Sequence, residues 1–489
     1  MNDLRNEIIR DFKKRECYDV LIIGCGPAGI SAATILNKKK IRIALIDAGD
    51  HYKNRYCFVD HGKKCANCQP CCKVVSGYGG SIQYGDSVKL SKFPAGKHLI
   101  NLLGKGRANK YMNTALNSLW DSGKCKNFIL HREEHLPFEN VKCYPVATLN
   151  TQEVKAFLRK TYKDLEKSRN VNLFLNTEVI SIQHLEKNGN FEILCVDNNK
   201  NQIKLLANKI IFAGGRHGLN WWKKTINNLG IKHEPCFPSF GLRFEGPKGL
   251  FRKAGKIHPD LKLSFYKKQY KIKTFCFCGG IGGGRIKTIN YGPFNLLDAH
   301  IVTEQNHKRH PGNFALMIKN ELPNRKHEIK KRIDEIISKY KTLNLLNPGK
   351  PVFQLYKDFR RNTATLFSID RLESQLEFTP SIRDIEPSNL ASLFTEKEHS
   401  YFCEIFENIF QWLYSLSSLP KDLQYQNKIL DYMLVIGIEI EDMWDRIILT
   451  PNMETSVKNI YVAGDATGVA QGILQAMVSG VAAAKGCLR

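Results

Sequence analysis

Apolar runs near the start of the chain alternate between strand and helix patterns. Val20 to Ile23 is a short apolar run of the strand type, and Pro27 to Leu36 is a run of small or apolar residues that suits a helix packed against a sheet. A second apolar run, Ile41 to Ile46, follows closely. This order predicts a strand–helix–strand unit, the building block of a parallel sheet.

Strand patterns gather again after residue 150. Asn150 and Glu153 have the spacing of a capping box, which predicts a helix from there to about Ser168. From about residue 230 to 441 the pattern mixes short β-like segments with helices near Arg325–Tyr340 and Glu396–Tyr414. Between these regions, four closely spaced strand-like runs predict a β-meander; they cover residues 171–175, 179–184, 191–196 and 203–212.

The turn between the first strand and the first helix carries glycines in G-x-G-x-x-G spacing. Gly24 permits a tight turn, Gly26 lets the backbone approach a pyrophosphate, and Gly29 lets helix and strand pack closely. The helix begins at Pro27 and Ala28, where unpaired N–H groups and the positive end of the helix dipole favour an anion. This loop therefore predicts a dinucleotide site.

The second strand ends in an acidic residue, Asp47, eighteen residues past Gly29. A carboxylate at this position accepts hydrogen bonds from the diol of a ribose and repels a 2′-phosphate. Strand, glycines, helix, strand and acid occur here in one sequence, which is far more specific than a Gly-rich turn alone. The pattern favours FAD or NAD over NADP.

The C-terminal segment TSVKNIYVAGDATGVAQGI resembles the closing signature of two-dinucleotide-fold flavoproteins. The resemblance implies that Asp465, in the Gly464–Asp465 pair, holds the ribityl chain, and that the backbone near Gly472 and Ile473 faces the flavin. NAD enzymes have no ribityl chain, so the resemblance implies FAD as the cofactor. A weaker piece, NKIIFAGGRHG with Gly214, resembles the strand and glycine stretch that closes the same domain.

Together these segments predict an α/β protein with a Rossmann-like FAD-binding domain (parallel sheet plus β-meander) interrupted by an inserted α+β substrate domain. The first part of the FAD-binding domain is expected over residues 1–229, with a Cys-rich insertion at about 51–106. The inserted substrate or cap domain covers 230–441, and the FAD-binding domain resumes over 442–489. Each end of the chain thus carries half of the nucleotide site.

Cysteines are densest in the insertion, where Cys65, Cys68, Cys71 and Cys72 follow Cys57. Four thiolates this close repel one another unless a cation or a disulfide joins them, and the spacing suits a zinc or iron–sulfur site. A redox-active dithiol and a structural loop of reduced thiols are the alternatives. A structural loop or a structural metal site is favoured first, a redox dithiol second and an electron-transfer cluster third. Zinc is the metal that we predict for these four thiols.

The segment SGYGGSIQYGD, residues 76–86, is rich in glycine. Gly79 and Gly80 would let the main chain run against a flat ring, so this segment is a candidate for flavin contact. Tyr84, Asp86 and Lys89 then become catalytic candidates on the substrate side, although a structural role suits each of them equally well.

The inserted region supplies further candidates. Arg243, in the segment SFGLRFEGP, is a fourth catalytic candidate. Cys276 and Cys278 lie two apart on an expected strand, so their side chains should share a face without facing each other in disulfide geometry. A core role for this pair is at least as well supported as a redox role. The segment GGIGGGR lacks G-x-G-x-x-G spacing, so NAD(P)H is expected only as a transient electron donor.

Over nearly its whole length the chain resembles the predicted FAD-dependent dehydrogenases. The resemblance is carried by the Cys-rich segment with SGYGGSIQYGDSVKLS, by FAGGRHGLNWW, SFGLRFEGP, TFCFCGG, PVFQLYKDF and GIEIE, and by the terminal Gly-Asp signature. It implies an FAD-dependent oxidoreductase that transfers a hydride at flavin N5 to or from an unidentified substrate. Where family members usually have a methionine and a proline beside FCFCGG, this chain has Phe277 and Gly279.

Composition sets the expected surroundings of the protein. Its 489 residues, 43% hydrophobic and 25% charged, are enough for two or three globular domains. No apolar run approaches the ~20 residues of a membrane span. The charged N-terminus MNDLRNEIIRDFKKRE has no signal-peptide pattern. We therefore expect a soluble, cytoplasmic protein whose cysteines are thiols or metal ligands rather than a disulfide framework.

The chain is strongly basic, with 73 Lys and Arg against 47 Asp and Glu and a net charge of +26. Such a charge would suit a nucleic acid, an acidic electron-transfer partner or an anionic small-molecule substrate. The lysines are dispersed, which favours a general compositional bias over a nucleic-acid site. The alternative functions are an FAD-containing protein that binds or modifies RNA with its basic face, and a non-catalytic scaffold that holds flavin and metal.

Overall fold

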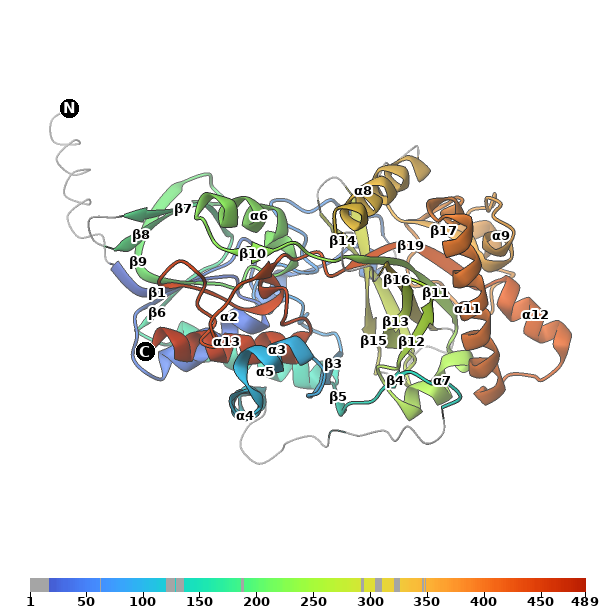
Figure 1. Cartoon of the computed structure of the whole chain (residues 1–489), viewed down its shortest axis with the longest axis horizontal. Helices are drawn as coiled ribbons and strands as arrows, with labels where there is room; N and C mark the ends of the chain where they lie inside the picture. The colour runs from blue at the N-terminus through green and yellow to red at the C-terminus, as the bar shows by residue number, and fades with distance from the viewer. Residues whose placement is uncertain are drawn as a thin grey trace.

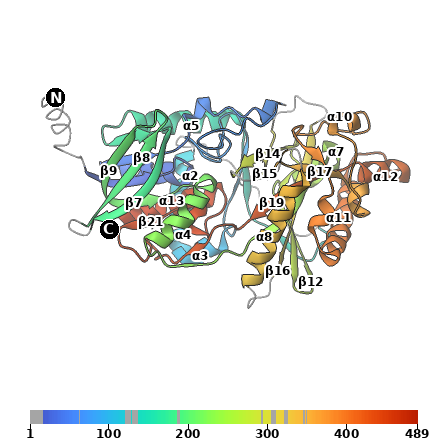
Figure 2. The same ribbon diagram turned by 90° about the horizontal axis from the view of Figure 1, so that it is seen from above.

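The computed structural model forms two bodies that lie side by side along the long axis of the molecule (Figures 1 and 2). It describes residues 17–61, 63–119, 128, 136–185, 189–291, 294–303, 310–320, 326–344, 347 and 349–489. The charged segment 1–16, on which the expectation about a signal peptide rests, lies outside the described residues. Within the described ranges, no helix is both long and apolar enough to cross a membrane.

The first body contains a seven-stranded sheet built from both ends of the chain. Its order is β6-β2-β1-β9-β8-β7, with β21 pairing β9. β6, β2, β1, β9 and β21 are mutually parallel, whereas β7, β8 and β9 form an antiparallel meander. The strands are β1 (Cys17–Ile23), β2 (Ile43–Ile46), β6 (Val171–Phe174), β7 (Thr177–Leu185), β8 (Asn190–Asp197), β9 (Gln202–Phe212) and β21 (Ile460–Val462).

The parallel strands are covered on both faces, which is why their sequences are almost continuously apolar. One face packs against helices at Ile22 and Leu45, and the other packs under the meander at Leu21 and Ile46. The helices α2 and α13, from opposite ends of the chain, lie side by side on the first face (Figure 1). The helices of this body are α2 (Pro27–Asn37), α3 (Lys97–Leu103), α4 (Lys105–Leu119), α5 (Thr151–Glu166), α6 (Leu219–Asn228) and α13 (Ile473–Cys487).

The start of α5 agrees closely with its sequence pattern. The Asn150 side chain accepts the Glu153 N–H at 3.0 Å, and the Glu153 carboxylate accepts the Asn150 N–H at 2.8 Å. Both halves of the predicted capping box are therefore present. The two predicted helices of the inserted region are also present, as α8 (Lys326–Leu343) and α11 (Glu396–Leu416).

The second body is organised around an eight-stranded, mainly antiparallel sheet of order β18-β17-β19-β11-β16-β13-β12-β4. All but one of its strands come from residues 239–441; β4 comes from the segment before α5. The strands are β4 (Val141–Lys142), β11 (Ser239–Pro247), β12 (Lys262–Lys267), β13 (Tyr270–Cys278), β16 (Pro311–Asn320), β17 (Val352–Leu355), β18 (Glu386–Pro387) and β19 (Leu434–Glu441).

Strand β11 shows why this sheet has two different faces. Phe240, Leu242 and Phe244 alternate along it with polar or charged residues and pack into an aromatic core beneath helices. The opposite face carries Arg243 and Glu245, which are buried. Helices of this body besides α8 and α11 are α7 (Lys248–Ile257), α9 (Tyr356–Arg360), α10 (Ile369–Leu372) and α12 (Leu423–Asp431).

Three two-stranded sheets complete the described structure. The pair β3–β5 precedes α5, the hairpin β14–β15 lies beside β19 and β16, and β10 pairs with β20. The predicted fold class is confirmed: a Rossmann-like parallel sheet with a β-meander is interrupted by an α+β region. The strands are β3 (Val88–Ser91), β5 (Val146–Leu149), β10 (His233–Glu234), β14 (Gly284–Asn290), β15 (Asn295–Ile301) and β20 (Arg446–Ile447).

Candidate functional site

The loop between β1 and α2 has the geometry that its glycines predict. Gly24 has a φ of +106°, and a Cβ there would lie 2.3 Å from the carbonyl oxygen of Ala213. A Cβ on Gly29 would lie 1.8 Å from the carbonyl oxygen of Gly24, so this glycine allows the helix to pack against the loop. A Cβ on Gly26 would meet only the Gly80 Cα, at 3.8 Å, because Gly26 opens onto a cavity.

Asp47 holds this loop in place from the end of β2. Its carboxylate accepts the backbone N–H groups of Cys25 at 2.7 Å, Gly49 at 2.8 Å and Gly77 at 2.7 Å. A carboxylate offers about four lone-pair sites, so acceptor capacity remains for a ligand. Asp47 also lines the cavity, where a ribose could reach it.

The C-terminal motif lies on the same cavity. β21 leads into a 3₁₀ turn, Gly464–Thr467, and Gly464 has a φ of +72°. Asp465 lines the cavity, and so do Gly472 and Ile473 at the start of α13. The helices α2 and α13 approach so closely that a Cβ on Gly480 would lie 2.1 Å from the Ala28 carbonyl oxygen.

A third segment, between β9 and α6, completes this side of the cavity. Gly214 and Arg216 both line it. Arg216 donates to the Asp298 carboxylate at 2.8 Å, and its Nε lies 3.9 Å from Asp465 Oδ2. Burial raises the pKa of Asp465, and the Arg216 guanidinium opposes that shift.

The cavity has a volume of about 1160 Å³ and lies between the two bodies. The first body contributes backbone-rich loops, whereas strands of the second body contribute side chains. Of the predicted residues, Gly29, Gly79, Cys65, Tyr84, Asp86 and Arg243 are not among those that line it. The lining includes these predicted residues: Gly24, Gly26, Pro27, Ala28, Asp47, Cys68, Cys71, Cys72, Gly80, Lys89, Gly214, Gly464, Asp465, Gly472 and Ile473.

Lys89 is the catalytic candidate that lies on the cavity. Its ammonium pairs with Asp260 at 3.0 Å, and the Tyr144 hydroxyl donates to the same carboxylate at 2.7 Å. Although burial opposes it, the Asp260 charge and two nearby thiols, Cys276 and Cys278, raise the pKa of Lys89. Lys89 therefore stays charged and serves as a fixed cation at neutral pH.

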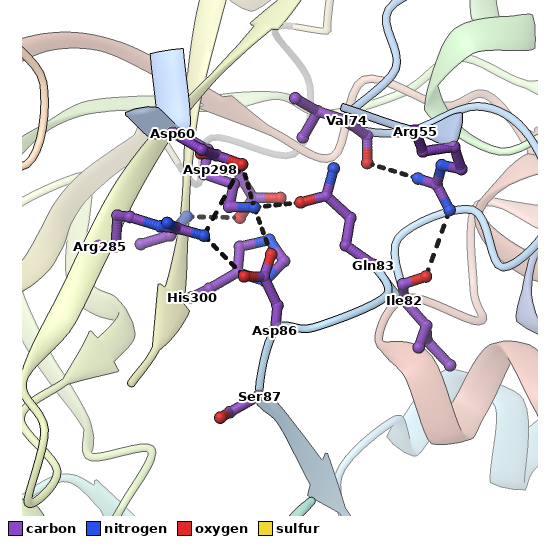
Figure 3. A network of polar contacts seen from close by, with 12 residues as sticks. Arg55, Asp60, Val74, Ile82, Gln83, Asp86, Ser87, Arg285, Asp298 and His300 are labelled. Carbon is purple, nitrogen blue, oxygen red and sulfur yellow. Dashed lines mark hydrogen bonds and ion pairs between the residues drawn. The ribbon is translucent and has the colours of Figure 1, made fainter. Parts of the chain in front are cut away.

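Asp86 belongs to an ion-pair network behind the cavity wall, shown in Figure 3. Arg285 donates to its carboxylate at 2.6 Å, and the almost fully buried Lys287 pairs with it and, at 3.0 Å, with Asp60. These cations lower the pKa of Asp86 despite its burial. Asp86 is therefore held ionised by structural partners.

His300 connects that network to the cavity. Its ring Nδ1 lies 3.9 Å from the nearer Asp86 oxygen, and the residue lines the cavity. Burial and the neighbouring Lys287 lower the pKa of His300 to about 4. A neutral imidazole is therefore available in the cavity at neutral pH.

The remaining two catalytic candidates have structural partners away from the cavity. Arg243 is fully buried and binds the Glu439 carboxylate with Nε–O and Nη–O distances of 2.6 and 2.9 Å. The Tyr84 hydroxyl accepts a hydrogen bond from Arg159, whose guanidinium also lies over the Tyr84 ring.

The Cys-rich segment does not assemble a metal site among the residues that the structure describes. No group of three or more His, Cys, Asp or Glu side chains is placed there to hold a metal ion. Burial raises the pKa of Cys71 to about 12 and also raises that of Cys72, which packs in an apolar cluster with Val74 and Ile289. The predicted zinc at Cys65, Cys68, Cys71 and Cys72 gains no support from this arrangement, which favours the structural loop.

Two cysteines of the inserted region depart from the regular strand that was expected there. The Cys276 and Cys278 sulfurs face each other at 3.8 Å, because β13 is irregular at this point and Cys276 has a φ of +46°. Sequence reasoning also missed Arg216, Asp298 and His300. Arg216 could have been found from the sequence, because it follows directly on the glycines of FAGGRHG. Asp298 and His300 alternate along β15, which predicts only that they share a strand face and does not show that this face lines the cavity.

Comparison with known proteins supports the nucleotide loop and little beyond it. A family model described as "Lycopene cyclase protein" matches residues 19–76, which include the glycine loop, Asp47 and the cysteine segment. The match covers far less than half of the chain, so it does not place the chain in that family. No curated protein matches the chain.

Several solved structures match the chain at low similarity. The aklavinone-11 hydroxylase in complex with FAD and aklavinone is 10% identical over 93% of this chain and 58% of its own, with a TM-score of 0.35. AlpK is 11% identical over 94% and 60%, with a TM-score of 0.34. A flavoprotein/dehydrogenase from Cytophaga hutchinsonii is 14% identical over 65% and 61%, with a TM-score of 0.30. The chain thus spans about three-fifths of these proteins, and likeness at this level carries no argument about activity.

Proposed function

We propose that this protein is an FAD-dependent oxidoreductase whose substrate enters the cavity between the two bodies. The proposal rests on one observation: a single cavity is lined by the β1–α2 loop, the Gly214 segment, the Gly464–Asp465 turn and strands of the second body. The first three are the segments that the sequence links to a flavin dinucleotide. Strands of the second body supply ionisable side chains to the same space.

The donors and acceptors around the cavity suit FAD. Gly26 leaves room for a pyrophosphate at the N-terminus of α2, where Ala28 also lines the cavity. Asp47 can still accept hydrogen bonds from the adenosine ribose, and Asp465 would accept hydrogen bonds from hydroxyl groups of the ribityl chain. The N-terminus of α13, at Ile473, would stabilise negative charge on a flavin ring.

When bound, FAD would supply two-electron chemistry by accepting or donating a hydride. The chain's own residues would bind and orient the substrate beside it. Lys89 provides a fixed positive charge, and His300 provides a neutral imidazole that can accept or relay a proton. Arg216 binds Asp298 on β15 and lies next to Asp465, so it connects the proposed ribityl-binding residue to the hairpin β14–β15.

Binding of FAD is the first test. The purified protein should be yellow and release FAD on denaturation, and apo-protein should take FAD up again. Asp465→Ala should weaken FAD binding by roughly 10- to 100-fold, since a hydrogen bond to a charged acceptor contributes about 1.5–3 kcal/mol. The matched control is Asp334→Ala, which replaces an exposed aspartate on α8; this variant should bind FAD normally. A colourless protein that takes up no FAD would overturn the proposal.

The reaction class needs a second measurement. Anaerobic visible spectra of the FAD-bound protein, recorded against a panel of metabolites and against NADH and NADPH, should reveal a compound that reduces the flavin. Reduction by a nicotinamide alone would identify the electron donor and leave the acceptor to be found. A flavin that neither dithionite nor any nicotinamide bleaches would instead favour a non-catalytic scaffold.

A further inference from the structure

Two cysteine sulfurs meet at the end of β13, on the wall of the cavity. In a regular strand, Cα atoms two residues apart are about 6–7 Å from each other and their side chains run parallel. Here the register of β13 against β16 breaks between Phe275 and Cys278, and Cys276 adopts a left-handed backbone with φ of +46°. The bulge brings the two Sγ atoms to 3.8 Å, within hydrogen-bonding contact. A left-handed conformation is uncommon for a residue other than glycine and often occurs at functional sites.

A single buried lysine contacts both sulfurs. Lys89 Nζ lies 3.9 Å from Cys276 Sγ and 3.8 Å from Cys278 Sγ. The same ammonium donates to the carbonyl oxygen of Phe277, between the two cysteines, at 2.5 Å. Asp260 holds the lysine in this position. The cation is therefore fixed where a thiolate on either cysteine would need it.

The surrounding charges distinguish the two thiols. The hydrogen bond from Cys278, together with Lys89 and Arg243, lowers the pKa of Cys276 to about 6, while burial and Asp298 act in the opposite direction. The same hydrogen bond, and then burial, raise the pKa of Cys278. At neutral pH the pair therefore holds one negative charge, on Cys276, and one proton, on Cys278.

Only one of the two sulfurs reaches the cavity. Cys276 lines it, whereas Cys278 has no exposed surface and is not a lining residue. The same cavity is lined by Asp465 and Ile473 of the proposed flavin site. A reactive sulfur at the surface with a second thiol directly behind it is the arrangement of a redox dithiol.

Several lysines and carboxylates line the cavity together with Cys276. Lys142, Lys262 and Lys273 line it. Burial and the neighbouring Lys271 lower the pKa of Lys142, which shows that the cations repel one another. Lys273 pairs with Glu441, and Lys262 Nζ lies 3.8 Å from Asp260, so this part of the wall carries charges of both signs.

We propose that Cys276 and Cys278 are a redox dithiol that reduces a small-molecule disulfide in this cavity. The Cys276 thiolate attacks one substrate sulfur and breaks the substrate S–S bond, which forms a mixed disulfide and releases the first thiolate. Cys278 then passes its proton to the thiolate released in the first step and attacks Cys276 Sγ, which forms the Cys276–Cys278 disulfide and releases the second substrate sulfur as a thiolate. The substrate gains two electrons and the cysteine pair loses two.

The oxidised pair must then be reduced again. Two electrons from a reduced flavin and one proton would return the pair to the Cys276 thiolate and the Cys278 thiol, and this part of the inference rests on the proposed function. The disulfide exchange itself requires only the two cysteines, so it can be tested whether or not flavin is bound.

Mass spectrometry of one peptide tests the exchange. The full-length protein is equilibrated with reduced and oxidised glutathione in varied ratios, quenched in acid, alkylated with iodoacetamide and cut with trypsin. Cleavage after Lys273 and Arg285 yields TFCFCGGIGGGR, which contains both cysteines. In the oxidising buffer this peptide should lack two hydrogens and carry no alkyl group, and in the reducing buffer it should carry two alkyl groups. Two alkyl groups in every buffer would overturn the proposal.

Serine variants assign the order of attack. Cys278→Ser should accumulate a mixed disulfide between Cys276 and glutathione, whereas Cys276→Ser should leave the enclosed Cys278 unmodified. The alkylation rate of Cys276 in the wild-type chain should rise with pH around a midpoint below that of an ordinary thiol, because Cys278 and Lys89 lower its pKa. A midpoint in the range of an ordinary thiol, about 8.5, would also overturn the proposal.

These measurements separate failure of the inference from failure of the proposed function. If the protein binds no FAD but forms the disulfide, the inference about the cysteine pair stands and its proposed reduction by flavin is wrong. If the protein binds FAD and the flavin can be reduced but the disulfide never forms, the proposed function stands and the dithiol proposal is wrong. If both hold, reducing the bound flavin with dithionite, followed by removal of the reagent, should convert the disulfide peptide to the doubly alkylated form.

Discussion

The two sides of the cavity are built in different ways. The first body presents glycines and helix N-termini, so its contacts with a ligand are made mainly by backbone. The second body presents ionisable side chains on β12, β13 and β15, such as Cys276 and His300. On the first side, glycines leave the space that a ligand would occupy. On the second side, the charges around the side chains set their reactivity. A substitution should therefore act through shape in one body and through charge in the other.

The two groups of cysteines on this cavity illustrate the same difference. Cys71 and Cys72 lie in a loop against apolar residues, and burial raises the pKa of both thiols. Cys276 lies beside Lys89 and Cys278, and its pKa is lowered to about 6. The denser group is thus the less reactive one, because a thiol is activated by neighbouring charge rather than by the number of other thiols.

The largest expected effect comes from a pair of glycine substitutions that separate folding from binding. Gly29→Ala places a Cβ 1.8 Å from the Gly24 carbonyl oxygen, so the free energy of unfolding should fall by more than about 3 kcal/mol. In Gly26→Ala the added Cβ meets no protein atom closer than 3.8 Å, so the free energy of unfolding should stay within about 1 kcal/mol of wild type. The same Cβ points into the space proposed for the pyrophosphate, so this variant should lose most FAD affinity. Urea unfolding and FAD titration measure the two effects. Equal stability of the two variants would contradict the argument from shape.

The charged wall of the cavity should respond most strongly to the loss of the cation at Lys89, which pairs with Asp260 of the second body. Lys89→Met leaves Asp260 buried without its ion-pair partner, which should cost about 3–5 kcal/mol of stability. Lys92→Met, three residues on, removes a cation that lies 4.1 Å from the ring centroid of Phe128 and should cost about 1 kcal/mol or less. Urea unfolding of both variants compares them. Similar losses for the two lysines would show that charge at the cavity wall has no special weight.

The pH dependence of stability should carry the signature of His300. Its pKa is lowered to about 4 in the folded protein, whereas an unfolded histidine has a value of about 6.5. The unfolded chain therefore binds the proton more readily, and stability should decrease as pH falls from about 6.5 to about 4, by at most about 3 kcal/mol. The difference between the unfolding profiles of wild type and His300→Gln isolates this contribution. Parallel profiles would mean that His300 titrates normally.

The smallest effect is expected in the cysteine-rich segment. The double substitution Cys65→Ser with Cys68→Ser should change the free energy of unfolding by less than about 1 kcal/mol, because neither side chain is fully buried. Elemental analysis should find well under one zinc per chain, since the described thiols do not form a set of ligands. Stoichiometric zinc, together with a large loss of stability in the double variant, would restore the metal site that the spacing predicts.

Local features of the fold could be predicted because their causes lie within a few residues. The turn at Gly24, the close packing at Gly29 and the capping box at Asn150 each depend on neighbours in the chain. Asp47 follows its strand directly, so its place beside the glycine loop could also be predicted. The meander and the interruption of the first domain followed from the order of strand patterns.

The roles of the charged candidates could not be predicted in this way. Asp86 was a catalytic candidate because it follows a glycine-rich segment, but Lys287 and Arg285, about two hundred residues later, pair with it. Arg243 was also a catalytic candidate, but Glu439 on β19 pairs with it in the core. Such partners are brought together by the packing of strands, and their spacing in the chain carries no sign of it.

By itself the sequence determined the Rossmann-like architecture and its glycine loop, because backbone geometry at glycines and helix starts is set by local residue types. The chemistry of the cavity was decided only by tertiary structure. The bulge at Cys276 and the approach of Lys89 from β3 join segments almost two hundred residues apart and turn two ordinary thiols into an unequal pair. A pKa depends on the charges and the solvent around a group, and both are fixed only when the chain is folded.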